Sequence, residues 1–243
     1  MRMVNLFYSD KLSSGVADIE DDVKRHGVVI KSKSGKVDLV DSSHHAYWID
    51  SSEYHSIPRY ESVPMGSTSF ENRLEAHTII ALLRKIDDAY AANNTTEPVE
   101  IGVINFYYSQ VRLLNELKRQ DIKQNGAYKV IKVEINTVDR FQGKEKPIVI
   151  VSLVRNNKHG KAGDSSHIAA YQRINVAVSR AQKLLFIVGA KNMYIDQRVN
   201  LDDMDTGEQL PQSPIYRQII ESFIANGCYL TADDILDEDY ENK

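Results

Sequence analysis

The feature that most constrains the fold is an almost unbroken apolar run at residues 147–154, which follows a polar turn containing Gly143. Apolar side chains at successive positions are typical of a strand buried on both faces of a parallel sheet. A second such run covers residues 184–188. Because parallel strands need long crossover connections, which are usually helices, the two runs predict an α/β fold.

The rest of the chain supplies the alternation that such a fold requires. Further strands are expected at residues 28–30, 37–40, 46–50, 99–104 and 129–135, and helices at residues 70–91, 109–119, 173–181 and 214–225. Ser69 is expected to cap the helix at 70–91, and Asn93-Asn94 to end it. The pattern predicts a doubly wound, mainly parallel sheet flanked by helices, with ligand sites at the carboxyl ends of the strands.

Length and composition predict an ordinary globular protein with one sizeable core. The chain has 243 residues, of which 42% are hydrophobic and 26% charged. It lacks an apolar run of membrane-spanning length and an N-terminal signal core, so a cytoplasmic location is expected. The single cysteine, Cys228, excludes an internal disulfide and is expected to be a small buried residue. The histidine spacing predicts no metal site.

Charge is distributed unevenly along the chain. Residues 137–191 hold ten Lys/Arg and three Asp/Glu, a net +7, whereas residues 192–243 hold three basic and twelve acidic residues, a net −9. A basic block of this kind suits a polyanion-binding face, although an ordinary solvated surface explains it equally well. We divide the chain into strands and loops at 1–68, alternating strands and helices at 69–195, and an acidic linker with one helix at 196–243.

Two arginines stand seven residues apart in the segment QRINVAVSRA, which covers residues 172–181. Seven residues are about two helical turns, so Arg173 and Arg180 share one helix face, while Ile174, Ala177 and Val178 turn inward. A guanidinium at a helix end beside a buried strand suits contact with a transferring phosphoryl group. Ordinary surface charges above a core helix account for the same pattern.

Four segments together resemble one family. TVDRFQGKE at 137–145 resembles motif V, and QRINVAVSRA motif VI, of the second RecA-like motor domain of superfamily-one helicases of the Upf-like group. Residues 101–110 resemble motif IV of that group, and NRLEA at 72–76 a short signature ahead of it. The resemblance implies a RecA-like, P-loop NTPase-like fold and the C-terminal motor domain of an ATP-dependent nucleic-acid helicase.

On the nucleotide side, the resemblance implies that Arg180 contacts the γ-phosphate as an arginine finger. Gly143 and Glu145 match residues near the nucleotide, and Glu145 is expected at the ribose hydroxyls unless it pairs with a neighbouring lysine. Gln142 is expected to bridge the nucleotide and nucleic-acid sites. Arg173 either approaches the phosphates or holds motif VI against the rest of the domain.

On the nucleic-acid side, the resemblance implies contacts of Thr137 and Val138 with the phosphate backbone of a single strand, through a hydroxyl and a main-chain N–H. Such contacts carry no sequence information. Without a reader of the 2′-hydroxyl, backbone contacts rarely separate DNA from RNA, so both substrates stay open. Asn105 stands where the family usually has a threonine, and its amide can still hydrogen-bond a phosphate. Tyr107 keeps the motif IV pattern, either touching the strand or packing in the core. Three basic residues follow the motif V strand: Arg155, Lys158 and Lys161. Their positive charges either attract the phosphate backbone of the nucleic acid or belong to an ordinary solvated loop.

The chain contains no GxxxxGK[ST] segment, and the acidic residues 237–239 do not follow a buried strand. ATP and Mg²⁺ are therefore expected to be held mainly by an N-terminal RecA-like domain, so that this chain alone is inactive. Members of the family carry an arginine-bearing motif about ten residues ahead of a Phe-Tyr pair like Phe7-Tyr8. Only six residues precede this pair here. We therefore expect the chain to be the C-terminal piece of a longer helicase. The alternative is a non-catalytic module that retains the fold for binding nucleic acid or protein. The presence of Glu145 and Arg180 counts against it.

Overall fold

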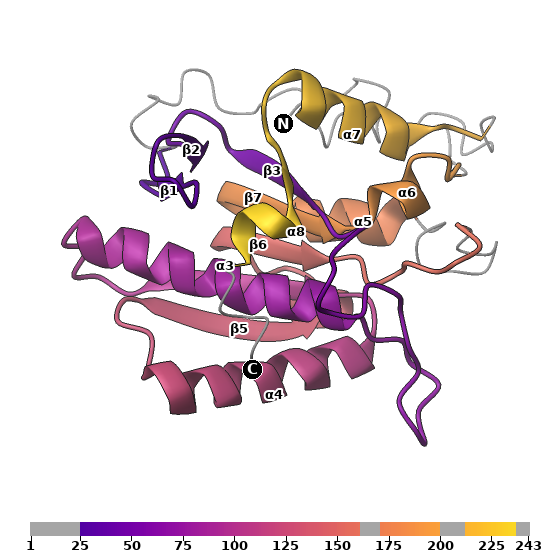
Figure 1. The fold of residues 1–243 in the computed structure, drawn as a ribbon, viewed down its shortest axis with the longest axis horizontal. Helices are drawn as coiled ribbons and strands as arrows, with labels where there is room; N and C mark the ends of the chain where they lie inside the picture. Colours follow the sequence, from indigo (N-terminus) through magenta and orange to yellow (C-terminus); the bar gives the residue numbers. More distant parts are fainter. Residues whose placement is uncertain (1–24, 161–170, 200–211, 237–243) are drawn as a thin grey trace.

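The computed structural model describes residues 25–160, 171–199 and 212–236. Its centre is a six-stranded sheet of order β5-β4-β6-β7-β3-β8, in which every pairing is parallel (Figure 1). The strands are β3 (Ala46–Asp50), β4 (Val99–Asn105), β5 (Ile131–Thr137), β6 (Lys146–Ser152), β7 (Ala181–Gly189) and β8 (Tyr229–Thr231). Two short strands, β1 (Ile30–Lys31) and β2 (Asp38–Val40), form a separate antiparallel pair. The predicted parallel α/β fold is confirmed.

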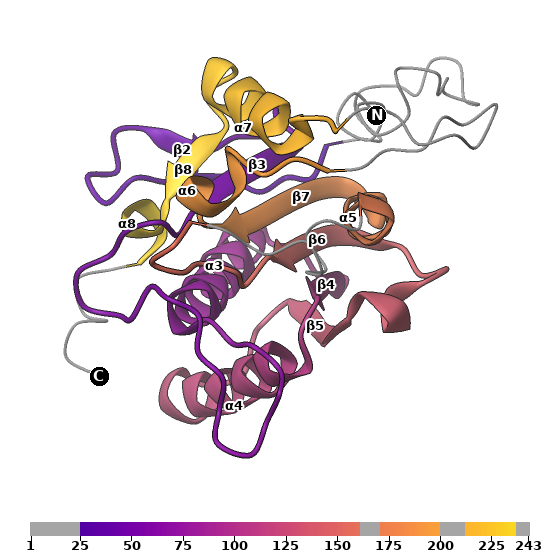
Figure 2. The ribbon, with the colours of Figure 1, turned by 90° about the vertical axis from the view of Figure 1, so that its right-hand side faces the viewer.

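Helices cover both faces of the sheet. They are α3 (Arg73–Ala92), α4 (Tyr108–Asn125), α5 (Tyr171–Val178), α6 (Lys191–Tyr194), α7 (Ile215–Ala225) and α8 (Ala232–Ile235), with a 3₁₀ turn η1 at Val138–Phe141. The long helices α3 and α4 pack together on one face, and α5 and α7 lie on the other (Figures 1 and 2). This is the doubly wound arrangement that alternating strands and helices predict.

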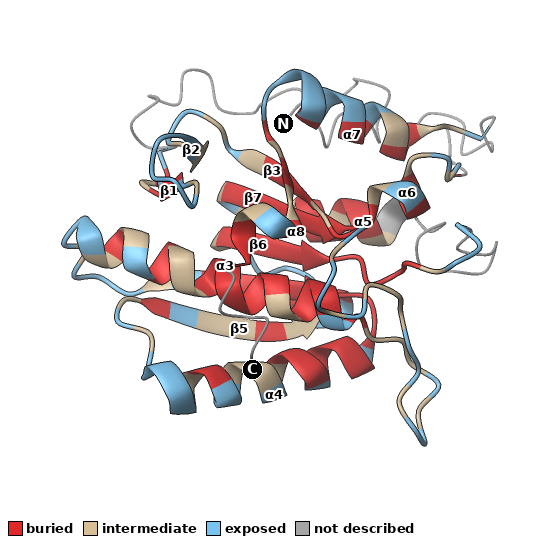
Figure 3. Cartoon of the chain, in the orientation of Figure 1, coloured by how far each residue is buried: buried red, intermediate tan, exposed pale blue. Residues whose placement is uncertain are grey.

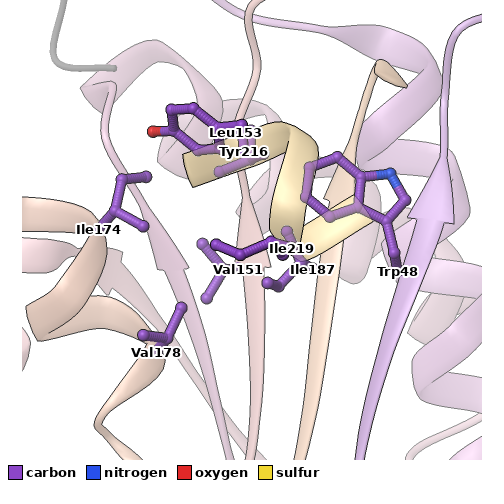
Figure 4. Close-up of a pocket in the computed structure, with 8 residues that line it drawn as sticks. All are labelled: Trp48, Val151, Leu153, Ile174, Val178, Ile187, Tyr216 and Ile219. Atoms are coloured by element: carbon purple, nitrogen blue, oxygen red, sulfur yellow. The ribbon is translucent and has the colours of Figure 1, made fainter. Parts of the chain in front are cut away.

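The core follows the apolar runs of the sequence. Residues 148–151 of β6 and 184–188 of β7 are buried, as their continuous apolar character predicts, and Figure 3 shows both strands buried along most of their length. A cavity of about 10 Å³ remains between these strands, α5 and α7, lined by residues such as Trp48, Ile174 and Tyr216 (Figure 4). Because that volume admits at most one water molecule, the cavity is a packing void rather than a ligand site.

The predicted cap of α3 is wrong. Asn72, not Ser69, precedes the helix, and its side chain accepts a hydrogen bond from the N–H of Glu75 at 3.0 Å. Ser69 Oγ instead accepts from the N–H of Ser109, at 3.1 Å, in the first turn of α4. Both residues are good caps, and tertiary packing decides which helix each one serves. The predicted end of α3 at Asn93 is confirmed.

The C-terminal part of the chain completes the sheet in a way that we did not predict. β8 pairs with β3, and α8 follows it directly. The six-stranded sheet therefore takes β3 from segment 1–68 and β8 from segment 196–243, and the three-segment division itself stays a prediction. Cys228, just before β8, is buried as expected, and burial raises the pKa of its thiol to about 11.

Several expectations concern residues outside those that the structure describes. These are Phe7-Tyr8 and the chain ahead of it, Lys161, residues 200–211 of the linker and the acidic residues 237–239. Within the described ranges, no helix combines the length and the apolar character needed to cross a membrane.

Candidate functional site

The parallel register places the motif residues at two opposite edges of the sheet. Thr137, Asn105 and Ser152 end three neighbouring strands in register, at the carboxyl edge. Lys146 and Ala181 begin β6 and β7 side by side, at the amino edge. Gly143, Glu145 and Arg180 precede these starts. They therefore lie at the amino edge and not at the carboxyl ends of the strands, where the sequence predicts ligand sites.

The reason is the path of the segment between β5 and β6. It leaves the carboxyl end of β5 and returns to the amino end of β6 within residues 138–145, crossing one face of the sheet. Phe141 is fully buried on this path and lies against Gly102 of β4. A Cβ atom at Gly102 would lie 2.9 Å from the Phe141 ring, closer than packed side chains allow. Because Gly102 has no side chain, the segment that carries Phe141 can cross the sheet here and connect its carboxyl and amino edges.

Arg180 stands at the amino edge, in the turn between α5 and β7. Its Nε donates to the carbonyl of Val176 at 3.1 Å, and its Nη2 donates to Ser179 Oγ at 3.0 Å. The carbonyl of Arg180 accepts from the N–H of Lys146 at 3.0 Å, which fixes the backbone beside β6. The side chain is partly exposed, and no carboxylate among the described residues pairs with it. The guanidinium is thus held against the last turn of α5, beside the amino edge, without a carboxylate partner among the described residues.

An exposed turn formed by residues 142–145 lies at the same edge. Gly143 has a φ of 77°, in the left-handed region that favours glycine, and a Cβ atom there would meet nothing within 4 Å. Glu145 Oε2 accepts from Gln182 Nε2 at 3.2 Å. The neighbouring lysines bind other carboxylates: Lys144 pairs with Glu134 at 2.9 Å, and Lys146 with Glu100 at 2.7 Å. The ion pair between Glu145 and a neighbouring lysine, which was the alternative to contact with the ribose, is therefore not formed.

Arg173 lies away from this edge. Its Nη2 pairs with Asp139 Oδ2 at 2.6 Å, which ties the start of α5 to η1. Seven residues of helix rise about 10 Å, so Arg173 and Arg180 serve different places although they share a face. The ion pair favours the holding role for Arg173 over contact with phosphates.

At the carboxyl edge, two of the predicted contact side chains are buried. Asn105 has no exposed surface, and its Nδ2 donates to the carbonyls of Val103 and Asn136, both at 3.3 Å. The ring of Tyr107 packs edge-on against Phe70 with centroids 5.5 Å apart. In this conformation both side chains pack in the core.

Thr137 and Val138 sit where β5 passes into η1. The Thr137 side chain is partly exposed, and its N–H donates to Asn136 Oδ1 at 3.0 Å. The side chain of Val138 is buried. Thr137 is thus the predicted contact residue whose side chain lies at the surface of this edge.

A buried carboxyl group, which sequence reasoning missed, organises the carboxyl edge. Glu75 has no exposed surface, and its Oε2 accepts from Ser152 Oγ at 2.7 Å and from the N–H of Val154 at 2.9 Å. Burial raises the pKa of Glu75 to about 8. Val154 has a φ of 70°, which branched residues rarely adopt, and its carbonyl accepts from Asn72 Nδ2 at 3.0 Å. Two residues of the NRLEA signature thus hold the exit of β6 in a strained conformation.

Gln110 extends this network to α4. Its Oε1 accepts from the N–H of Asn72 at 2.8 Å, and its Nε2 donates to Ser152 Oγ at 3.1 Å. The network therefore joins the starts of α3 and α4 to the end of β6. Both segments that carry it were visible as family signatures, but sequence alone does not show that their polar residues meet inside the core.

The side chain of Arg155 makes its contacts within the domain. Its Nε pairs with Glu61 at 3.0 Å, and its guanidinium lies 4.4 Å from the centroid of the Phe70 ring. The residue is buried, so it serves packing. Lys158 is exposed and lies 6.0 Å from the ring centroid of Tyr60.

A family model and several curated proteins match this chain. Residues 2–192 match the family AAA_12, described as an AAA domain. The DNA replication ATP-dependent helicase/nuclease DNA2 of Bos taurus is 35% identical over 135 residues, covering 56% of this chain and 11% of the relative. The Homo sapiens protein of that name is 35% identical over 133 residues, covering 55% and 11%. This chain therefore spans only a small part of the length of these relatives.

A search of solved structures gave a weaker likeness. The large terminase of a thermophilic bacteriophage matches with a TM-score of 0.33 and 11% sequence identity, covering 64% of this chain and 39% of that chain. At this TM-score the likeness carries no argument, and the fold assignment rests on the strand order and pairings described above.

Proposed function

Because this chain belongs to the AAA_12 family, the C-terminal region of Upf1-like and DNA2-like superfamily-one helicases, we propose that it is one half of an ATP-dependent helicase motor. In this proposal it closes over ATP held by an N-terminal RecA-like domain. It supplies the arginine finger and part of the single-strand binding surface.

The placement of Arg180 carries the proposal. Described residues use two of the five N–H donors of its guanidinium, and those two bonds fix its direction without neutralising its charge. An arginine held in this way can stabilise the charge that develops on the γ-phosphate during transfer, with little reorganisation. Arg155, which is buried, is paired with Glu61, as buried arginines usually are, whereas the partly exposed Arg180 has no carboxylate partner among the described residues.

The amino edge offers a suitable place for the rest of a nucleotide. The open turn at Gly143 leaves room for a ligand beside Glu145, whose carboxylate can accept from ribose hydroxyls, and Gln142 is exposed next to it. Mg²⁺ and the phosphates are assigned to the N-terminal domain. Mg²⁺ bound there would neutralise phosphate charge, and at the phosphates this chain would add the Arg180 guanidinium.

The carboxyl edge is proposed to contact the backbone of single-stranded DNA, through the Thr137 hydroxyl and the Val138 N–H. The names of the relatives, which act in DNA replication, favour DNA over RNA. Residues 137–145 form one continuous stretch that touches both edges, so closure over ATP at one edge can shift the grip on the strand at the other.

Replacement of the finger tests the proposal. In the full-length protein, Arg180→Ala is expected to lower ATP turnover roughly a thousandfold or more, since an arginine finger typically contributes this much, while nucleotide binding stays largely intact. Steady-state turnover and fluorescent-nucleotide titration measure the two quantities. Arg119→Ala, which removes an exposed arginine of α4, is the matched control. Turnover near the wild-type rate in Arg180→Ala would refute the assignment.

A further inference from the structure

A short hairpin projects from the carboxyl edge beyond the body of the domain. Residues 62–71 form it, and the N–H groups of Ser62 and Glu71 donate to each other's carbonyls at 2.8 and 2.9 Å. Its turn is closed by a bond from the N–H of Ser67 to the carbonyl of Pro64 at 3.0 Å. Figure 1 shows this loop extending past α4 at the side to which the strands point, and Figure 3 shows it as a mixture of exposed and half-buried residues.

The tip of the hairpin is apolar although solvent surrounds it. Met65 is 102% exposed and Val63 is 47% exposed, and Tyr108, at the start of α4, is 65% exposed. These three make up half of the six large hydrophobic residues that are exposed in the described ranges. Single exposed apolar residues are common, but a gathering of them at one edge indicates a contact surface.

The hairpin is braced rather than loose. Ser67 Oγ lies 2.9 Å from Ser109 Oγ, and Ser69 Oγ accepts from the N–H of Ser109 at 3.1 Å. The returning arm therefore attaches to the residue next to Tyr108. At the base, Glu61 pairs with Arg155 at 3.0 Å and accepts from the N–H of Asn156. An apolar tip on a fixed support needs little ordering when it binds a partner.

Cations and a further aromatic ring flank this surface. The guanidinium of Arg59 lies 5.0 Å from the centroid of the Tyr60 ring, and Lys158 Nζ lies 6.0 Å from it. Arg112, one turn after Tyr108 on α4, is exposed. Aromatic or apolar side chains interleaved with cations are typical of surfaces that bind single-stranded nucleic acid, where bases stack on the rings and cations follow the backbone.

We propose that hairpin 62–71 and Tyr108 form a base-contacting site for single-stranded nucleic acid. Bases of the strand that crosses the carboxyl edge lie against Met65 and stack on Tyr108, while Thr137 and Val138 hold its phosphates. This inference rests on the proposed function, because it assumes that a strand passes this edge. It adds contacts with the bases, which the backbone contacts alone do not provide.

The test compares strands with and without bases. Fluorescence anisotropy measures binding of this chain to a single-stranded DNA oligonucleotide and to an abasic strand of equal length, which keeps the phosphates and lacks the bases. Wild-type protein is expected to bind the base-bearing strand at least about fivefold more tightly, as loss of one stacked base implies. Tyr108→Ala and Met65→Ser should reduce that preference and leave affinity for the abasic strand unchanged.

Val37→Ser is the matched control, because Val37 is 60% exposed in the turn between β1 and β2, away from this edge. All three positions are exposed, so folding should be retained, and circular dichroism checks this. Equal affinity for the two strands, or unchanged preference in Tyr108→Ala and Met65→Ser, overturns the base-contacting site while strand binding survives. Failure of wild-type protein to bind either strand overturns both this site and the proposed strand-binding surface.

Discussion

At the scale of single residues, the carboxyl edge depends on a carboxyl group that the core disfavours as an anion. Both close donors to Glu75, Ser152 Oγ and the N–H of Val154, bond to Oε2, whereas Oε1 has only a 3.5 Å contact with Ser51 Oγ. A protonated acid or an amide can keep both donors on one oxygen and offer a hydrogen to Ser51. The hydrogen-bond network around Glu75 therefore does not require the carboxyl group to be ionised.

This geometry predicts a pH dependence of stability. Unfolded Glu75 ionises above its ordinary pKa of 4.5, whereas the folded group holds its proton up to about 8. Its contribution is thus fully present below pH 4.5 and is lost as the pH rises toward 8. We expect Glu75→Gln to flatten this part of the curve and to be the more stable protein at about pH 8. Urea unfolding across the range measures it, and an unchanged slope in Glu75→Gln would contradict the account.

At the scale of elements, the ends of α3 and α4 show what sequence can and cannot assign. Helical periodicity locates both helices, and a continuous apolar run locates β6. Ser69 and Asn72 are equally plausible caps by residue type, and only tertiary contacts assign them to different helices. Tyr107 and Tyr108 are adjacent aromatic residues at a strand-to-helix turn, so their opposite burial depends on packing against Phe70. The short strand β8 covers only Tyr229–Thr231, too few residues to show a period.

The two caps should differ in energy. Asn72→Ala removes the cap of α3 together with bonds from Nδ2 to the carbonyls of Arg59 and Val154, and the Asn72 side chain itself is fully buried. We expect a loss of about 2–4 kcal/mol in the free energy of unfolding. Ser69→Ala, in a less buried position, should cost about 1 kcal/mol or less. Chemical denaturation of both variants checks this, and equal losses would show that the cap assignment is wrong.

At the scale of the whole molecule, the parallel sheet has a carboxyl edge and an amino edge on opposite sides. The segment of residues 137–145 runs from the first edge to the second. The continuous buried runs were enough to predict the parallel sheet, and the arginine spacing was enough to predict that α5 buries Ile174, Ala177 and Val178. The crossing of the segment between β5 and β6 was not predictable, because turn residues do not reveal which edge a loop returns to. It depends on the close contact of Phe141 with Gly102.

The central claim is that this chain contributes Arg180 to a nucleotide held by another domain. The most direct measurement is Mg²⁺-dependent ATP turnover by this chain alone, by the N-terminal motor domain alone, and by the two mixed, with single-stranded DNA present. We predict turnover only in the mixture, and its loss when the chain carries Arg180→Ala. Turnover by this chain alone, or equal restoration by the Arg180→Ala chain, would contradict the account.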